Sequence, residues 1–291
     1  MSSGQVEKLR PFFSDHSRGW RDNRYVYPVI SRRAGGLSIG VNLNPDKACN
    51  FDCVYCQVDR GVPPVTREVD VALLAEELER TVDAALGGEL FTDPHFAGVP
   101  AEARRINDIA FSGDGEPTTC PRFVEAVGLA ADLRRRRGLD AVKLVLITDA
   151  AYLDRPRVRE GLAILDDNNG EIWAKLDAGT EEYYRLINRP NVPLRKILDN
   201  ILGAARIRPI VIQSLWMKVH GRPPPETEVE AFAGRLRDIL ADGGRLRLIQ
   251  VYTIARRTAE PWVAPLTEDD LTRVADRVRA AVNVPVAVFG G

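Results

Sequence analysis

The sequence contains few of the side chains that bind metals: four cysteines, two methionines and three histidines among 291 residues. It has no apolar stretch near the roughly 20 residues that a membrane helix needs. Its first ten residues lack an apolar signal core, so we predict a cytoplasmic protein without membrane contact. Charges nearly cancel, at 40 Lys and Arg against 41 Asp and Glu, which excludes a strongly basic nucleic-acid-binding protein but allows a local basic patch.

Three of the four cysteines lie close together, with Cys49, Cys53 and Cys56 in the spacing C-x3-C-x2-C. A large cytoplasmic enzyme keeps its thiols reduced, so a soft metal centre explains the clustering better than disulfides do. The alternatives are a zinc site, for which a second C-x2-C pair is missing, and a four-cysteine electron-transfer cluster that includes Cys120. A [4Fe–4S] cluster held by three cysteines would leave one iron open. Incidental buried thiols are the remaining explanation.

The cysteine spacing, with Tyr55 directly before Cys56, resembles the signature of the radical S-adenosylmethionine (SAM) superfamily. The resemblance implies a [4Fe–4S] cluster on Cys49, Cys53 and Cys56 whose open iron binds the amino and carboxylate groups of SAM, with Tyr55 as a cofactor-binding residue. It also implies one-electron cleavage of SAM to methionine and a 5′-deoxyadenosyl radical, which abstracts hydrogen from a substrate. The electron would come from a flavodoxin- or ferredoxin-type donor.

A second motif follows the apolar segment 108–112, which reads as a buried strand. The segment Gly113-Asp114-Gly115-Glu116-Pro117 resembles the Gly-Gly-Glu-Pro run of the same superfamily, with Asp114 in place of the second glycine. The resemblance implies that this loop binds the SAM ammonium group. Glycines let backbone carbonyls approach a cation, and Glu116 adds negative charge. The alternative is an ordinary turn at a strand end.

Strands and helices alternate after a basic segment at residues 1–35, where seven Lys and Arg face three Asp and Glu, a net charge of +4. We predict residues 1–35 as an irregular extension and residues 36–291 as one α/β domain. Six strands are expected, at 37–43, 108–112, 142–148, 171–177, 210–215 and 246–254, with a further short strand possible at 285–289. Interleaved helices favour a parallel sheet with right-handed crossovers, which matches the open (β/α)6 partial TIM barrel of the resembled superfamily.

Active sites on such sheets gather at the carboxyl ends of the strands. The cysteine loop follows the first predicted strand and the Gly113–Pro117 loop follows the second. Polar residues at the other strand ends are further candidates for contacts with SAM: Thr148, Lys175, Asp177 and Ser214. Asp177 and Ser214 could instead cap or form a turn, and Lys175 could pair with the SAM carboxylate or with a neighbouring acid. The three histidines are scattered, and we assign no catalytic residue.

Several stretches, among them 37–43, 111–117 and 175–190, resemble the group of radical SAM enzymes around the wyosine-base synthases. Those enzymes rebuild a guanine in tRNA with the help of a second iron–sulfur cluster. This chain has no cysteine before Cys49, so a related but different substrate is expected: RNA, a small molecule or a peptide. The basic extension could meet RNA phosphates through its arginines and stack bases on Tyr25 and Tyr27, or it could pair with the acidic remainder of the chain. An iron–sulfur protein that does not cleave SAM is the alternative function.

Overall fold

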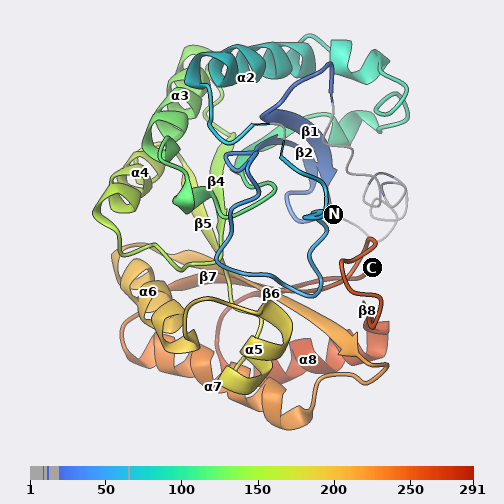
Figure 1. Cartoon of the computed structure of the whole chain (residues 1–291), viewed down its shortest axis with the longest axis vertical. Helices are drawn as coiled ribbons and strands as arrows, with labels where there is room; N and C mark the ends of the chain where they lie inside the picture. The colour runs from blue at the N-terminus through green and yellow to red at the C-terminus, as the bar shows by residue number, and fades with distance from the viewer. Residues whose placement is uncertain (1–8, 10–11, 13–19, 65) are drawn as a thin grey trace. The chain divides into compact units, whose positions relative to one another are not determined.

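The computed structural model describes residues 9, 12, 20–64 and 66–291, in which strands and helices alternate along the chain (Figure 1). These residues fall into two compact units. The first unit draws on residues 1–48, 64–146 and 156–171, and the second on residues 49–63, 147–155 and 172–291. Among the helices that the structure describes, none is long and apolar enough to cross a membrane.

The first unit contains a sheet covered by helices. Its strands are β1 (Val26–Ser31), β2 (Gly36–Val41), β3 (Ile106–Phe111) and the larger part of β4 (Lys143–Thr148). Strand β1 pairs antiparallel with β2, whereas β2, β3 and β4 are parallel neighbours. The helices α2 (Val71–Leu86), α3 (Phe123–Arg136) and α4 (Pro156–Asp166) lie side by side (Figure 1). Three short 3-10 helices complete it: η1 (Glu89–Thr92), η2 (Ala101–Ala103) and η3 (Pro117–Thr119).

The second unit has the same layered design. Its strands are most of β5 (Gly170–Lys175), with β6 (Ile210–Val219), β7 (Leu246–Thr253), β8 (Val263–Pro265) and β9 (Val286–Phe289). Strands β5, β6, β7 and β9 are parallel neighbours in that order, and β8 pairs antiparallel with β6. Its helices are α5 (Glu181–Asn188), α6 (Leu194–Ile207), α7 (Glu226–Ala241) and α8 (Glu268–Ala281).

The described residues form nine strands, so the predicted six-stranded sheet is wrong in number, while the α/β class with mostly parallel strands is confirmed. Strand β1 lies inside the segment predicted to be irregular, and β8 lies in a proline-flanked stretch. Both pair antiparallel: β1 joins β2 through a short turn, and β8 follows β7 but pairs back with β6. Counting alternating strands and helices in a sequence therefore misses them.

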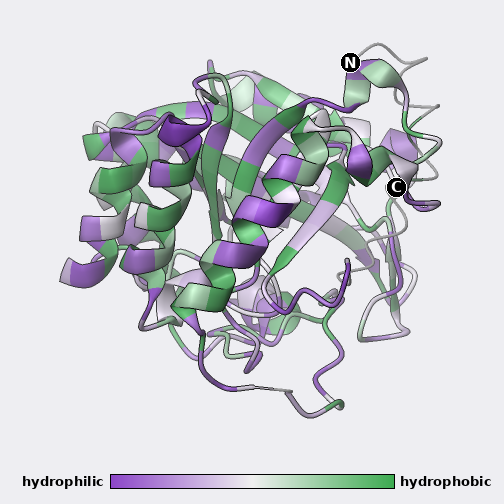
Figure 2. Ribbon diagram, turned by 90° about the horizontal axis from the view of Figure 1, so that it is seen from above, coloured by the Kyte–Doolittle hydropathy of each residue, from purple (hydrophilic) through white to green (hydrophobic). Residues whose placement is uncertain are grey.

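The helices are amphipathic, and side chains cap the N-termini of several of them. Thr267 is the N-cap of α8, and its hydroxyl accepts the N–H of Asp270 at 3.1 Å. Asp70 does the same for α2, accepting the N–H of Ala72 at 3.0 Å. Figure 2 shows hydrophilic and hydrophobic residues alternating along the helices, which is the pattern of helices with one buried face.

Two aromatic side chains predicted to stack on RNA bases are buried. Tyr25 is 1% exposed and Tyr27 is 6% exposed, and the Tyr27 hydroxyl lies 3.1 Å from that of Ser112. Both rings pack in the interior of the protein. The prediction that these tyrosines stack on RNA bases is therefore wrong for this structure. Arg21 pairs with Glu89 at 2.6 Å. Other basic residues of the extension lie outside the described residues: Lys8, Arg10 and Arg18.

Candidate functional site

The cysteine loop has no helix or strand between residues 49 and 63, and neighbouring backbone holds it in place. The last carbonyls of α5 accept its amides: Asp52 N–H bonds the Asn188 carbonyl at 3.0 Å, and Val54 N–H bonds the Ile187 carbonyl at 2.9 Å. The final carbonyls of a helix have no partner within the helix, so they are free to take these bonds. The C-terminus of α5 thus fixes the backbone on both sides of Cys53.

A second segment of the same unit holds the loop from its other end. The Ala259 N–H donates to the Cys56 carbonyl at 2.7 Å, and the Glu260 N–H donates to the Val54 carbonyl at 3.2 Å. A turn closes between the two cysteines, where Cys56 N–H bonds the Cys53 carbonyl at 2.9 Å. These bonds fix the backbone of residues 52–56, and the three cysteines of the loop are half-buried.

Four polar side chains gather around Cys53. The Asn188 amide Nδ2 donates to Tyr55 Oη at 3.0 Å, to Asp177 Oδ2 at 3.1 Å and to Cys53 Sγ at 3.4 Å. The Tyr55 hydroxyl donates to the same Asp177 oxygen. Lys175 Nζ lies 3.6 Å from Asp177 Oδ2 and 4.7 Å from the centre of the Tyr55 ring. The structure therefore brings three predicted SAM-contact residues together beside one predicted cluster ligand.

Burial determines the protonation of Cys53 and of the side chains around it. It raises the pKa of the Cys53 thiol to about 11, an effect that Lys175 opposes and Asp177 reinforces. Burial and the nearby Asp177 carboxylate raise the pKa of Tyr55 well above its usual range, so its hydroxyl remains a hydrogen-bond donor at neutral pH. A thiolate at Cys53 consequently needs a cation beside it, and iron would supply one.

Arg60 adds positive charge to the other two thiols. Burial lowers the pKa of its guanidinium, but the thiols of Cys56 and Cys49 outweigh burial, and the pKa is raised. Among the described residues, no three His, Cys, Asp or Glu side chains converge to hold a single metal ion. Three thiols spread along one loop and accompanied by a cationic donor instead fit a larger, anionic group such as an iron–sulfur cluster.

The predicted glycine–glutamate loop lies in the first unit, after β3. A Cβ on Gly115 would come within 1.9 Å of the Ala48 carbonyl oxygen, and a Cβ on Gly113 within 2.4 Å of Asn42 Oδ1. Gly113 also has a φ of +154°, which favours glycine. The Glu116 N–H bonds the Ala48 carbonyl at 2.9 Å. Both glycines are thus required by close packing of this loop on the segment before the cysteines.

The Glu116 carboxylate begins the short helix η3. Its Oε1 accepts the N–H of Thr118 at 3.1 Å and the Thr118 hydroxyl at 2.5 Å, and the residue is 2% exposed. Asp114 pairs with the Asn42 amide at 2.7 Å. Glu116 therefore caps η3, a role that the sequence did not predict, and binding of SAM by this residue stays a prediction.

Thr148 and Asp149 shape the turn after β4. Thr148 Oγ1 accepts the Ala150 N–H at 3.0 Å and so helps to form this turn. Asp149 accepts the Ala151 N–H at 2.8 Å, and its Oδ1 lies 3.4 Å from the Asn50 amide of the cysteine loop. The turn thereby contacts the loop through Asp149.

Ser214 is not brought to the polar cluster around Cys53. Parallel register pairs Lys175 with Gln213, so these two side chains share one face of the sheet. The next residue, Ser214, lies on the opposite face together with Trp216, which packs against Phe232 of α7. Ser214 is fully buried there, and its hydroxyl has no hydrogen-bond partner.

Asn188 and Arg60 were not predicted as site residues. Each is distant in the sequence from at least one group that it contacts, and an asparagine at a helix end reads as an ordinary helix terminus.

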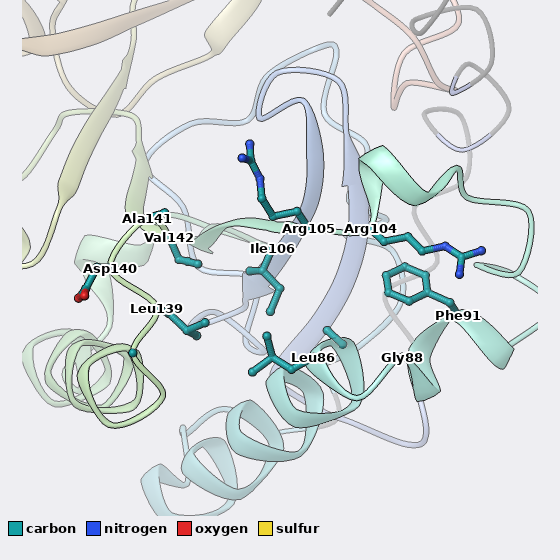
Figure 3. Close-up of a pocket in the computed structure, with 12 residues that line it drawn as sticks. Leu86, Gly88, Phe91, Arg104, Arg105, Ile106, Leu139, Asp140, Ala141 and Val142 are labelled. Carbon is teal, nitrogen blue, oxygen red and sulfur yellow. The ribbon is translucent and has the colours of Figure 1, made fainter.

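Cys120 is buried in the first unit, where its sulfur accepts the Arg122 N–H at 3.4 Å. A pocket of about 530 Å³ in the same unit is lined by α2, β3 and the segment before β4 (Figure 3), and none of the predicted site residues lines it.

The site is thus a loop of three thiols beside a buried tyrosine, aspartate and asparagine and a half-buried lysine, on an α/β scaffold. A family model described as the radical SAM superfamily matches residues 43–219, which is more than half of the chain. The protein therefore belongs to the radical SAM superfamily.

Two curated proteins are similar in sequence to the chain. A UPF0026 protein of Methanocaldococcus jannaschii is 31% identical over 175 residues, covering 60% of this chain and 46% of that protein. A protein of Brachyspira hyodysenteriae named GTPase Obg is 22% identical over 272 residues, covering 92% of this chain and 35% of that protein. The chain thus spans less than half the length of these two relatives.

Solved structures share the fold. A radical SAM methyltransferase from Sphaerobacter thermophilus aligns with a TM-score of 0.62 at 16% identity, over 91% of this chain and 69% of that one. The structure of TYW1 with a lysine-pyruvate adduct bound aligns with a TM-score of 0.55 at 12% identity, over 98% of this chain and 90% of that one. The predicted similarity to the wyosine-synthase group is confirmed for the fold.

Proposed function

We propose that this protein binds a [4Fe–4S] cluster through Cys49, Cys53 and Cys56 and uses it to cleave SAM reductively. When bound, the cluster supplies one electron to the sulfonium, which yields methionine and a 5′-deoxyadenosyl radical that abstracts hydrogen from a substrate. The observation that carries the proposal is the cysteine loop itself. Backbone hydrogen bonds from the end of α5 and from residues 259–260 hold its residues 52–56, and all three cysteines lie on this one short loop.

The residues around Cys53 have defined tasks in this proposal. Lys175 offers a cation for the carboxylate of SAM, and it lies over the Tyr55 ring, where the face of the aromatic ring stabilises positive charge. Asp177 holds its place by accepting the Leu215 backbone N–H at 2.8 Å, so its second oxygen can orient Lys175 and Tyr55. Burial of these groups excludes water from the neighbourhood of Cys53, which protects a reactive radical.

Anaerobic reconstitution with iron, sulfide and SAM tests the proposal. Addition of dithionite should release methionine and 5′-deoxyadenosine in equal amounts. Replacing Cys49, Cys53 or Cys56 by Ala should remove most of the bound iron and abolish both products. A cluster that forms normally but never cleaves SAM, even with candidate substrates, would instead favour an electron-transfer protein.

The electron donor and substrate are further parts of the proposal. A flavodoxin- or ferredoxin-type protein would reduce the cluster, and RNA, a small molecule or a peptide would receive the radical. RNA is supported by the basic charge of residues 1–35. The ion pair between Arg21 and Glu89 argues against RNA binding, because it engages one of those arginines within the protein.

A further inference from the structure

Asn188 occupies a special position at the cysteine loop, because its backbone and its side chain both contact that loop. Its carbonyl accepts the Asp52 N–H at 3.0 Å, and its side-chain Nδ2 donates to Cys53 Sγ at 3.4 Å. The residue is the last of α5 and is 1% exposed. The helix end therefore delivers a fixed amide donor to one thiol of the loop.

The chemistry of the neighbours determines which way the amide faces. Its Nδ2 side meets the Cys53 sulfur, the Asp177 carboxylate and the Tyr55 hydroxyl oxygen. Because the Tyr55 hydroxyl donates its hydrogen bond to Asp177, the Tyr55 oxygen acts as an acceptor for the Asn188 amide. Turning the amide over would take the donor away from all three contacts and place the amide oxygen against the Asp177 carboxylate, which repels it.

One donor group thus links a cluster ligand to the charged residues beside it. We propose that Asn188 is a positioning residue that makes the cluster easier to reduce, through an N–H···S hydrogen bond to the Cys53 thiolate. This inference rests on the proposed function, since it requires a cluster on Cys53. A hydrogen bond to a ligand sulfur stabilises the more electron-rich, reduced cluster and raises its reduction potential.

The position of Asp177 gives this bond a second effect. Its carboxylate lies within electrostatic reach of Cys53, and negative charge there opposes the addition of an electron to the cluster. The Asn188 amide stands in contact with both groups and donates to both. It therefore offsets the repulsion while it keeps Asp177 and Tyr55 in place.

The test compares reduction potentials, measured by EPR-monitored redox titration of the reconstituted protein. Asn188→Leu keeps the approximate volume and removes the donor, and its potential should shift to more negative values. Asn188→Gln retains an amide and should recover part of the shift. The matched control is Asn191→Leu, because Asn191 is exposed and meets the loop only through its backbone N–H, at 3.0 Å from the Asn50 carbonyl. Equal potentials in Asn188→Leu and the control would overturn the inference.

A measurement on the wild-type protein covers the case in which Asn188→Leu does not fold or hold a cluster. With ¹⁵N in the asparagine side chains, pulsed EPR of the reduced cluster should show hyperfine coupling to an amide nitrogen. No coupling would refute the hydrogen bond. A wild-type protein that binds no cluster at all would instead refute the proposed function, so the two failures are distinguishable.

Discussion

Asp108 gives the sharpest stability prediction, because a carboxyl group is buried inside the sheet of the first unit. It lies on β3, is 3% exposed and accepts a hydrogen bond from the Ser38 hydroxyl of β2. Other charges near it are Arg33 and Lys143, which favour its ionised form, and Glu171, which opposes it. Strand β3 leads directly into the Gly113–Glu116 loop, so its stability bears on the candidate site.

Burial raises the pKa of Asp108 from 3.8 to about 6, and the Ser38 hydrogen bond and the two cations only partly oppose this. The folded protein therefore holds this proton more tightly than the unfolded chain does. The resulting stabilisation is complete below pH 3.8 and is lost as the pH rises to about 6. The shift of about two pKa units corresponds to about 3 kcal/mol of unfolding free energy.

Asp108→Asn removes this titration while its side-chain oxygen can still accept the Ser38 hydrogen bond. We expect the variant to gain about 2–3 kcal/mol in unfolding free energy, relative to wild type, between pH 4 and pH 7.5. Urea denaturation followed by circular dichroism gives the unfolding free energy of each protein at pH 4 and at pH 7.5. The difference between variant and wild type is then compared between the two pH values. The exposed Asp167→Asn is the control and should change little. An Asp108→Asn effect that is the same at both pH values would refute the reasoning.

Four further predictions concern the site and its substrate. Cys120→Ala should retain iron and the absorbance near 400 nm, and loss of either would favour a four-cysteine electron-transfer cluster. Glu116→Gln keeps the capping oxygen but removes the charge, so SAM binding measured by titration calorimetry should weaken by roughly 1.5–3 kcal/mol. Unchanged affinity would show that the loop is only a turn and does not bind SAM. Gly115→Ala should cost about 1–3 kcal/mol of stability through the clash with the Ala48 carbonyl, by thermal denaturation, and a stable variant would contradict the close approach. Replacing Arg21 and Arg24 by Ala should abolish salt-sensitive tRNA binding if RNA is the substrate, whereas no binding at low salt would exclude it.

Local patterns in the sequence were enough to predict the thiol loop and most helices. Three cysteines in one short segment can reach one centre whatever the remaining fold is, so their spacing alone indicates a shared ligand. Helix α8 begins at Thr267 because its hydroxyl bonds an amide three residues away. Interactions over such short separations do not depend on the tertiary structure.

The sequence could not predict contacts between distant segments. Asn188 donates to Cys53 across 135 positions, and nothing near either residue indicates this pairing. Strand β1 looked like part of a charged extension, yet it pairs with β2 and buries Tyr25 and Tyr27. The glycines at 113 and 115 were assigned to ligand approach, whereas the structure shows them packed against Asn42 and Ala48.

The sequence by itself thus determined which residues can form a thiol centre and which segments form helices, because both depend on spacing along the chain. The tertiary structure decided the rest: Tyr55, Lys175 and Asp177 meet beside Cys53, while Ser214 lies on the other face of β6. The physical reason is that strand register sets the face on which each side chain lies, and register depends on how distant segments pack.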